Sequence, residues 1–305
     1  LLITEAALAE GARIVDQNGK EVIEAKFEPR EKLSRSIYQA VHNGSGSAFI
    51  DLQPLGKDKL PVILPQTYEL VQAVAGIDVS KQPVPIYPAA HRSIGGIETD
   101  MAGRTSLNGL FAVGECACNG LNGAGRLAGN TLTEALVFGG KTGQAAAVYA
   151  RTEQRRGSLV SRLEDEERRL ASLTEPAKAA AAGDSTLRLH AELGKLMNDN
   201  VGLVRDASSL QAALDQVRSL KERYAGIRLR NTSRIYNSEL TSYLELGSLL
   251  NIGELVVMAA LARTETRGAH YRTDFPQRND SQWTRHSIIS RVDGAPYVGS
   301  RSVCA

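Results

Sequence analysis

The pattern of hydrophobic and polar positions divides the chain into four regions. In the first region, residues 1–87, apolar runs at 12–15 and 48–52 have the length of β-strands, and Gln17-Asn18-Gly19 is a turn signal between them. This region also holds six of the ten prolines, which favour turns and short elements over long helices. It is predicted to form a small domain of mixed strands and helices.

The second region, residues 88–153, is rich in glycine. An apolar run at 109–114 predicts a strand, residues 120–129 predict a loop, and apolar positions from Leu132 to Ala147 predict a helix. The order in this region is therefore strand, loop, helix.

The last two regions differ in the spacing of their apolar residues. Residues 154–265 are rich in Glu, Arg, Leu and Ala and have leucines at helical spacing, which predicts an antiparallel helical bundle interrupted at Pro176 and at Gly183-Asp184. Residues 266–305 are polar, rich in arginine and poorly periodic, which favours a tail wrapped over other surfaces. The four regions together predict an α+β fold.

Composition and charge exclude several classes of protein. The chain has 305 residues, of which 42% are hydrophobic, and 36 basic and 34 acidic residues give a net charge of +2. This near-equal number of basic and acidic residues does not indicate a nucleic-acid partner or binding to an anionic membrane surface. Because no apolar run reaches about 18 residues, no direct membrane insertion is expected.

Cysteine usage indicates a reducing compartment. The three cysteines, Cys116, Cys118 and Cys304, are an odd number, and a lone C-x-C lacks the second ligand pair of a metal site. Neither a disulfide framework nor a metal centre is expected.

The main candidate for chemistry is the glycine loop. Residues 123–128 fit G-x-G-x-x-A, a pattern of dinucleotide-binding loops, but no acidic residue lies near position 143 and eight residues separate the loop from the strand before it. A pyrophosphate site is therefore disfavoured. What remains is a helix N-terminus at Asn130-Thr131 with Arg126 ahead of it, a combination that attracts an anion or the electron-rich edge of a ring.

Motifs along the whole chain resemble one enzyme family. The flavoprotein subunits of succinate dehydrogenase and fumarate reductase, and the related L-aspartate oxidases, carry similar motifs in the order Thr4-Glu5, Pro29-Arg30-Glu31, residues 90–100, residues 109–115, residues 123–132 and residues 264–272. The resemblance implies a capping domain (1–87), the second segment of an FAD-binding domain (88–153), a helical domain (154–265) and a C-terminal tail (266–305). The family's N-terminal FAD-binding region precedes the Thr-Glu motif and has no counterpart in this chain.

The resemblance also implies roles for single residues. In the succinate–fumarate reaction, Arg30 would be the catalytic proton donor, reprotonated by Glu5, while Thr4, His91 and Arg126 would bind the substrate carboxylates. Four residues would contact the FAD, namely Glu115, Asn130, Thr131 and Leu132. The family usually has an arginine in the proton relay where this chain has Leu8.

Each of these residues also has an ordinary structural interpretation. An arginine in a Pro-Arg-Glu-Lys stretch is commonly a surface charge, a lone histidine is commonly part of the packing, and Glu115 could cap a turn. For Arg267 and His270, structural pairing and contact with a partner subunit are as well supported as a direct role.

The resemblance leaves alternatives for function. The first is a flavoprotein that acts on C4 dicarboxylates, receives or donates electrons through an iron-sulfur subunit, and is cytoplasmic or peripheral to a membrane through its partners. L-aspartate oxidation is the second, although residues 279–286 resemble the extended end of succinate and fumarate enzymes. The third is a non-catalytic or incomplete chain that needs a separate N-terminal FAD-binding half.

Overall fold

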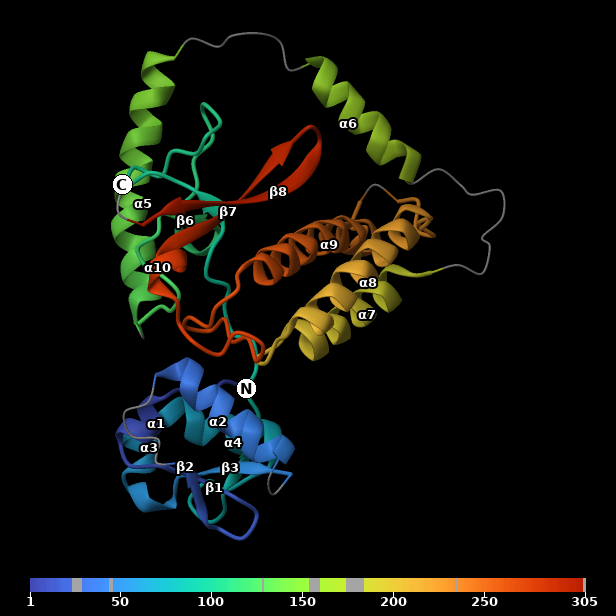
Figure 1. Ribbon diagram of the computed structural model, residues 1–305. Helices are drawn as coiled ribbons and strands as arrows, with labels where there is room; N and C mark the ends of the chain where they lie inside the picture. Colours follow the sequence, from blue (N-terminus) through green and yellow to red (C-terminus); the bar gives the residue numbers. More distant parts are fainter. Residues whose placement is uncertain are drawn as a thin grey trace. The chain divides into compact units, whose positions relative to one another are not determined.

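The computed structural model describes residues 1–23, 29–43, 46–127, 129–153, 160–173, 184–233 and 235–303 (Figure 1). Predictions that involve Ala128, Pro176, Gly183 and Cys304 lie outside the described residues. The chain divides into two compact units, Leu1–Arg92 and Ser93–Ala305, each with its own hydrophobic core. The mixture of helices and strands confirms the predicted α+β class.

The first unit is a four-stranded antiparallel sheet covered by short helices. Its strands lie in the order β2-β1-β3-β4, with Ile14 of β1 opposite Ile50 of β3. The elements in chain order are α1 (Ala6–Ala9), β1 (Arg13–Val15), β2 (Glu21–Ile23), α2 (Arg30–Asn43), β3 (Ala48–Asp51), α3 (Leu60–Ile63), α4 (Pro65–Ala75) and β4 (Val84–Ile86). The strands predicted near 12–15 and 48–52, and the turn between them, are confirmed.

The core of this unit follows from the local periodicity. Leu33 and Ile37 lie one helical turn apart on α2, and both are buried in the cluster that contains Ile14 and Ile50 of the sheet. Leu8 of α1 is also buried there. An arginine at this position would place a charge in an apolar core.

The second unit begins with irregular chain around a small parallel pair. Strands β5 (Ile97–Glu98) and β6 (Ala117–Cys118) pair in parallel. The prediction of a strand at 109–114 is wrong, because within this stretch only Phe111 forms a β-bridge, to Arg104. Glycines at both ends have left-handed φ values, +83° at Gly109 and +75° at Gly114, which end the extended backbone.

Helices make up most of the rest of this unit. The predicted helix after the glycine loop is α5 (Asn130–Thr152), and the predicted bundle contains α6 (Val160–Leu173), α7 (Thr186–Val201), α8 (Ala207–Ala225) and α9 (Ser238–Ala262). Helices α7, α8 and α9 contact one another in pairs and bury leucines at helical spacing, such as Leu210, Leu214 and Leu246. The helical prediction for this region is confirmed.

The C-terminal region is more regular than its sequence indicates. After α10 (Asp280–Trp283), strands β7 (Arg285–Val292) and β8 (Ala295–Ser302) form an antiparallel hairpin. Its two-residue turn is Asp293-Gly294, with φ values of +49° and +81°, as in a type I′ turn. Arg301 of β8 pairs with Glu98 of β5, so the hairpin lies against the start of the unit.

Helix α9 is long and apolar enough to cross a membrane by length and composition, and among the described residues it is alone in this. It also supplies Tyr243, Leu246, Leu250 and Val257 to the core of the bundle. A core helix has the same composition as a membrane span.

Candidate functional site

The loop that carries Arg126 is built from successive turns. Amides of Gly123 and Gly125 donate to the carbonyls of Gly120 (3.2 Å) and Asn122 (3.3 Å). The Arg126 side chain is half-buried, and its guanidinium has no hydrogen-bond or ion-pair partner among the described residues. A planar, permanently charged fork without a partner is suited to a carboxylate ligand.

Two contacts fix this loop to the rest of the unit. The Asn122 amide donates to the carboxylate of Glu134, which is buried on α5, at 2.7 Å. On the other side, the Ala124 carbonyl accepts from the amide of Ala269 at 3.4 Å. Glu134 was not among the predicted site residues, although a glutamate among apolar helix positions was a signal for it.

Helix α5 begins directly after the loop and presents the residues predicted to contact the cofactor. Its N-cap is Gly129, at φ +82°, which has no side chain to accept from the first N–H groups of the helix. The N–H group of Asn130 donates to the Leu127 carbonyl at 3.2 Å, so the donors at this helix end are the N–H groups of Thr131 and Leu132. The Leu132 side chain is 73% exposed. The start of α5 therefore offers hydrogen-bond donors and the positive end of the helix dipole to an electron-rich group.

Glu115 lies in a single 3₁₀ turn (Gly114–Cys116) that packs against α5. Its Oε1 atom accepts from the amide of Ser93 at 3.1 Å. The structure therefore brings the turn of Glu115 next to the helix whose N-terminus carries Thr131 and Leu132.

The other predicted site residues belong to the first unit. The guanidinium of Arg30, at the start of α2, forms an ion pair with Glu5, in which Nη2 donates to Oε2 at 3.1 Å. Both side chains are more than 40% exposed. Thr4 is exposed, and its carbonyl accepts from the amide of Ala7, while His91 is exposed in chain without regular structure. The structure thus pairs the predicted proton donor with its predicted relay carboxylate.

These residues fit part of an FAD molecule. Donors at the start of α5 and the nearby Glu115 suit the flavin ring and the chain attached to it, and a Cβ built on Gly114 or Gly129 would meet open space. The described loop 120–127 does not have the tight strand-to-helix turn that holds a pyrophosphate, because successive turns separate strand β6 from helix α5. The residues at the start of α5 therefore suit the flavin end of FAD, and the loop before them does not suit its pyrophosphate.

A buried polar network after α9 was not anticipated from the sequence. Glu265 is fully buried and accepts from Arg263 and Arg267 and from the amide of Asn279. Burial works to raise the pKa of Glu265, but these hydrogen bonds hold it below its usual value. Arg272, only 1% exposed, pairs with Asp274 at 2.7 Å and donates to the last carbonyls of α9.

His270 completes this network as a neutral side chain. Arg205 donates to Nδ1 at 3.1 Å, and because a guanidinium can only donate, the ring proton lies on Nε2, which donates to the Arg263 carbonyl at 3.1 Å. Burial, together with nearby arginines, lowers the pKa of His270 from 6.5 to about 4. For Arg267 and His270, the structure therefore shows internal structural pairing.

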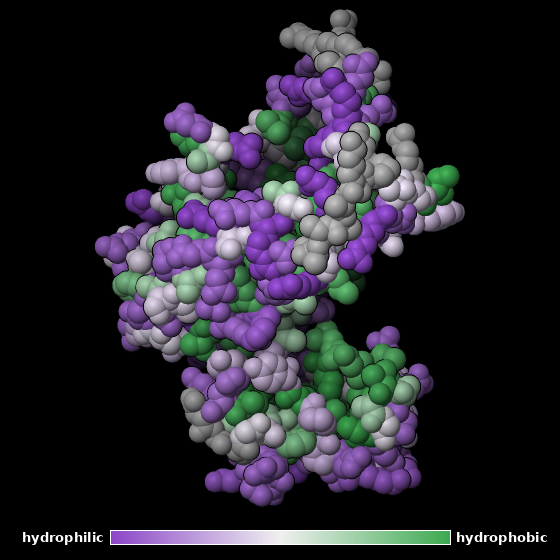
Figure 2. Space-filling model, turned by 90° about the vertical axis from the view of Figure 1, so that its right-hand side faces the viewer, coloured by the Kyte–Doolittle hydropathy of each residue, from purple (hydrophilic) through white to green (hydrophobic). Residues whose placement is uncertain are grey.

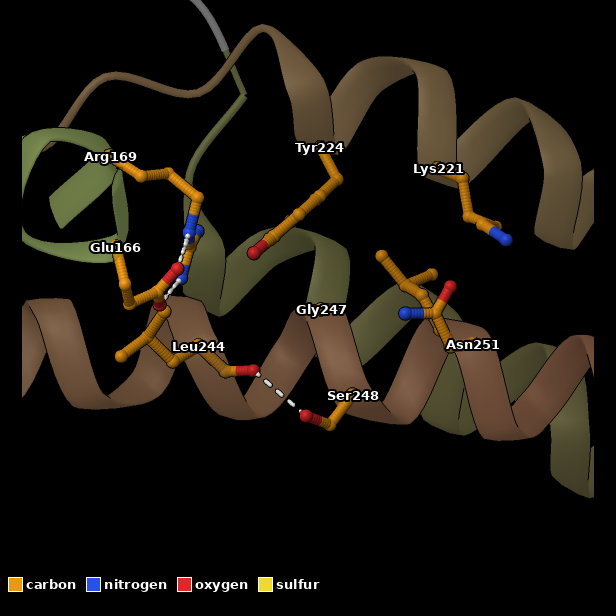
Figure 3. Close-up of a pocket in the computed structure, with 9 residues that line it drawn as sticks. Glu166, Arg169, Lys221, Tyr224, Leu244, Gly247, Ser248 and Asn251 are labelled. Atoms are coloured by element: carbon orange, nitrogen blue, oxygen red, sulfur yellow. Dashed lines mark hydrogen bonds and ion pairs between the residues drawn. The ribbon is translucent and has the colours of Figure 1, made fainter. Parts of the chain in front are cut away.

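A pocket of about 510 Å³ in the helical bundle is separate from the predicted site residues (Figure 3). Arg169 and Glu166 of α6 lie at one end of the pocket, Tyr224 and Lys221 of α8 lie along one side, and α9 forms the opposite side. Its two cations already have carboxylate partners, since Arg169 pairs with Glu166 and Lys221 with Glu254, each at 2.6 Å. The pocket is therefore a poor candidate for an anion site.

Comparison with known proteins first defines the class. A family model for an FAD binding domain matches residues 1–132, and one for the C-terminal part of the fumarate reductase flavoprotein matches residues 190–304. The class that these two matches define is that of FAD-binding flavoproteins.

Curated and solved relatives narrow the class to one family. The fumarate reductase flavoprotein subunit of Mycobacterium tuberculosis is 34% identical over 98% of this chain and 56% of the relative, and that of Haemophilus influenzae is 31% identical over 98% and 54%. A solved quinol-fumarate reductase with menaquinol molecules matches with a TM-score of 0.91 at 31% identity, over 100% of this chain and 57% of that chain. This chain belongs to the family of fumarate reductase and succinate dehydrogenase flavoprotein subunits, whose cofactor is FAD, and it spans about half the length of these relatives.

Proposed function

We propose that this chain forms the C-terminal half of a flavoprotein that interconverts fumarate and succinate. The observation that carries the proposal is Arg126, an arginine directly after two anchored turns, with no partner of its own among the described residues. The relatives named above are fumarate reductases, which favours this reaction over L-aspartate oxidation.

Substrate binding requires groups for two carboxylates. Arg126 is proposed to bind one carboxylate through its two-pronged fork, while His91 and Thr4 contribute further contacts. All three side chains are exposed or half-buried, as a ligand site requires.

When bound, FAD would supply hydride chemistry for the reduction of fumarate. Glu115, Asn130, Thr131 and Leu132 are proposed to hold the flavin end of FAD. The N–H groups of Thr131 and Leu132 would donate toward its electron-rich edge, where the dipole of α5 favours negative charge.

The second hydrogen arrives as a proton. Arg30 is proposed to give a guanidinium proton to the alkene carbon that does not receive the hydride, and Glu5 to return a proton to Arg30. Their direct ion pair supports this order. Because Leu8 is buried in the core, the relay in this chain would pass from Glu5 to Arg30 without a further arginine from α1.

The proposal extends to partners. About half of each relative has no counterpart in this chain, and the resemblance assigns that half to the N-terminal FAD-binding region. Helix α5 supports the need for it, since its buried face carries Glu134 and Thr142 whereas Leu132 and Leu136 are more than 70% exposed. An iron-sulfur subunit, which would carry electrons and hold the protein at the cytoplasmic side of a membrane, is proposed as the second partner.

The substitution Arg126→Lys tests the proposed function. In the flavoprotein that contains both halves, lysine keeps the charge but loses the bidentate geometry, so fumarate reduction should fall by about 10²-fold or more while the flavin absorption spectrum stays unchanged. Arg151→Lys is the matched control, because Arg151 is an exposed arginine at the C-terminal end of α5, the helix that follows the Arg126 loop. It should leave turnover at the wild-type level. Loss of FAD together with activity in Arg126→Lys would instead make Arg126 a cofactor or folding residue.

A further inference from the structure

Residues 267–270 form a tight hairpin at the centre of the buried polar network. The amide of His270 donates to the Arg267 carbonyl at 3.1 Å, and the amide of Arg267 donates back at 2.9 Å. Of the two central residues, Gly268 alone has a positive φ, +58°, which is the pattern of a type II′ turn. The tip of this hairpin is Gly268-Ala269.

The hairpin tip lies against the backbone of the Arg126 loop. A Cβ built on Gly268 would overlap the Ala124 carbonyl oxygen and lie 2.7 Å from its carbon. Ala269 donates its amide to the same oxygen at 3.4 Å. Only glycine permits this approach, so the contact is specific in both shape and backbone conformation.

Polar contacts of Arg267 and His270 fix both sides of the hairpin. The Arg267 guanidinium binds Glu265 (2.7 Å) and Asp280 (2.6 Å), and the His270 ring is held between Arg205 and the Arg263 carbonyl. A tip fixed in this way can resist displacement of the loop it touches. On the loop side, Gly123 and Gly125 would otherwise leave the backbone before Arg126 free to adopt many conformations.

We propose that the Gly268-Ala269 tip is a positioning element that holds the Ala124 carbonyl and thereby sets the direction of Arg126, two residues further on, toward a substrate carboxylate. The carboxylate role of Arg126 rests on the proposed function, whereas the clamp on the loop does not. The tip thus acts through Arg126 and does not itself contact the substrate.

The clamp is tested by amide hydrogen exchange of the chain itself, measured by mass spectrometry. Gly268→Ala should accelerate exchange in residues 120–127, which include the turn amides of Gly123 and Gly125, by about tenfold. Gly294→Ala is the matched control, because Gly294 also has a positive φ (+81°) in a hairpin turn but a Cβ there meets open space. The control should leave exchange at 120–127 unchanged. Unchanged exchange in Gly268→Ala would overturn the proposal.

A second variant covers the case in which Gly268→Ala fails to fold. His270→Asn keeps an acceptor for Arg205, but its shorter side chain does not place a donor where Nε2 meets the Arg263 carbonyl. It should therefore loosen one side of the hairpin and accelerate exchange at 120–127 by a smaller factor. If a folded His270→Asn chain shows wild-type exchange there, the clamp is likewise overturned.

The link to Arg126 is tested by malonate binding to the FAD-loaded flavoprotein that contains both halves. Gly268→Ala should weaken malonate binding by about tenfold with an unchanged flavin spectrum, in parallel with Arg126→Lys. If Arg126→Lys weakens binding and Gly268→Ala does not, the positioning role is overturned and the proposed function stands. If neither variant weakens binding, the carboxylate role of Arg126 fails, and the positioning role fails with it.

Discussion

Two arginines of the candidate site have opposite electrostatic surroundings. Arg30 forms an ion pair with Glu5, whereas the guanidinium of Arg126 has no partner among the described residues. A group that transfers a proton benefits from a carboxylate that can restore it, while a group that binds a carboxylate must be free to do so. The local pairing therefore agrees with the different roles proposed for them.

Replacement of Arg30 should separate proton transfer from substrate binding. In the flavoprotein with both halves, Arg30→Ala should lower fumarate reduction by about 10² to 10⁴-fold, the usual range for loss of a general acid. Malonate affinity should change little, because a proton donor acts mainly in the transition state.

The controls for Arg30 are a conservative variant and a stability measurement. Arg30→Lys retains a charge and a transferable proton and should recover part of the rate. Both variants should unfold at nearly the wild-type temperature, since exposed ion pairs contribute about 0–1 kcal/mol. Arg30→Ala with most of the wild-type rate would show that the proton comes from another group.

His270 should make the stability of the second unit depend on pH. Its pKa is 6.5 in the unfolded chain and about 4 in the fold, so the unfolded state binds more protons between these values and stability falls as pH falls. The free energy of unfolding should be about 2 kcal/mol lower at pH 5 than at pH 7. Urea unfolding at the two pH values measures this difference.

The variant His270→Asn isolates that contribution. Carboxylates with lowered pKa values, such as Asp274 at about 2, titrate in both proteins and cancel in the comparison. The difference in unfolding free energy between pH 5 and pH 7 should therefore shrink in the variant. An equal difference in both proteins would mean that His270 is protonated in the fold.

At the scale of elements, local signals account for where several helices begin. Helix α8 starts with a capping box, in which the Asp206 carboxylate accepts from the amide of Ser209 at 2.8 Å and the Ser209 hydroxyl accepts from the amide of Asp206. Asn237 caps α9 by accepting from the amide of Leu240 at 2.9 Å. Both caps use side chains that favour helix N-termini.

Removal of the α8 cap gives an element-scale prediction. Asp206→Ala should lower the free energy of unfolding by about 1 kcal/mol, because the first amides of the helix lose their acceptor. Asp206→Asn retains an acceptor and should lose less. Asp215→Ala, at an exposed position within the same helix, is the control and should change stability by about 0.5 kcal/mol or less. Urea unfolding monitored by helical circular dichroism would rank the three variants, and equal losses would contradict the capping role.

At the scale of the whole molecule, the exposed hydrophobic surface is the main feature. Green areas in Figure 2 show hydrophobic residues at the surface among hydrophilic ones. Helix α5 is the clearest case, because Leu132, Leu136 and Val148 are more than half exposed while Glu134 is buried. A large apolar face is typical of a surface that another segment or subunit covers.

This surface leads to a prediction about the cofactor. The chain by itself should bind FAD weakly, since its described residues fit only the flavin end, and should gain tight binding when the N-terminal half of the flavoprotein is supplied. Absorption spectra after gel filtration with excess FAD measure the bound fraction. A purified chain that is yellow, with FAD in a one-to-one ratio, would contradict the prediction.

The sequence by itself determined the type and place of elements whose signals are local. Apolar period and turn residues act over a few positions, and they predicted helices α5, α8 and α9 and strands β1 and β3. The β7–β8 hairpin was missed although Asp293-Gly294 is a strong turn signal, and the strand at 109–114 was predicted wrongly because the left-handed glycines at its ends were not considered.

Only the tertiary structure decided which distant residues meet and which are buried. It placed Gly268 against Ala124, buried Glu265 between two arginines, and turned the polar Glu134 of α5 inward while its leucines remained exposed. None of these follows from local period, because burial and close backbone contacts depend on segments far apart in the sequence. The candidate residues could therefore be named from motifs, but the free state of Arg126, the pairing of Arg30 with Glu5 and the anchors of the Arg126 loop required the folded chain.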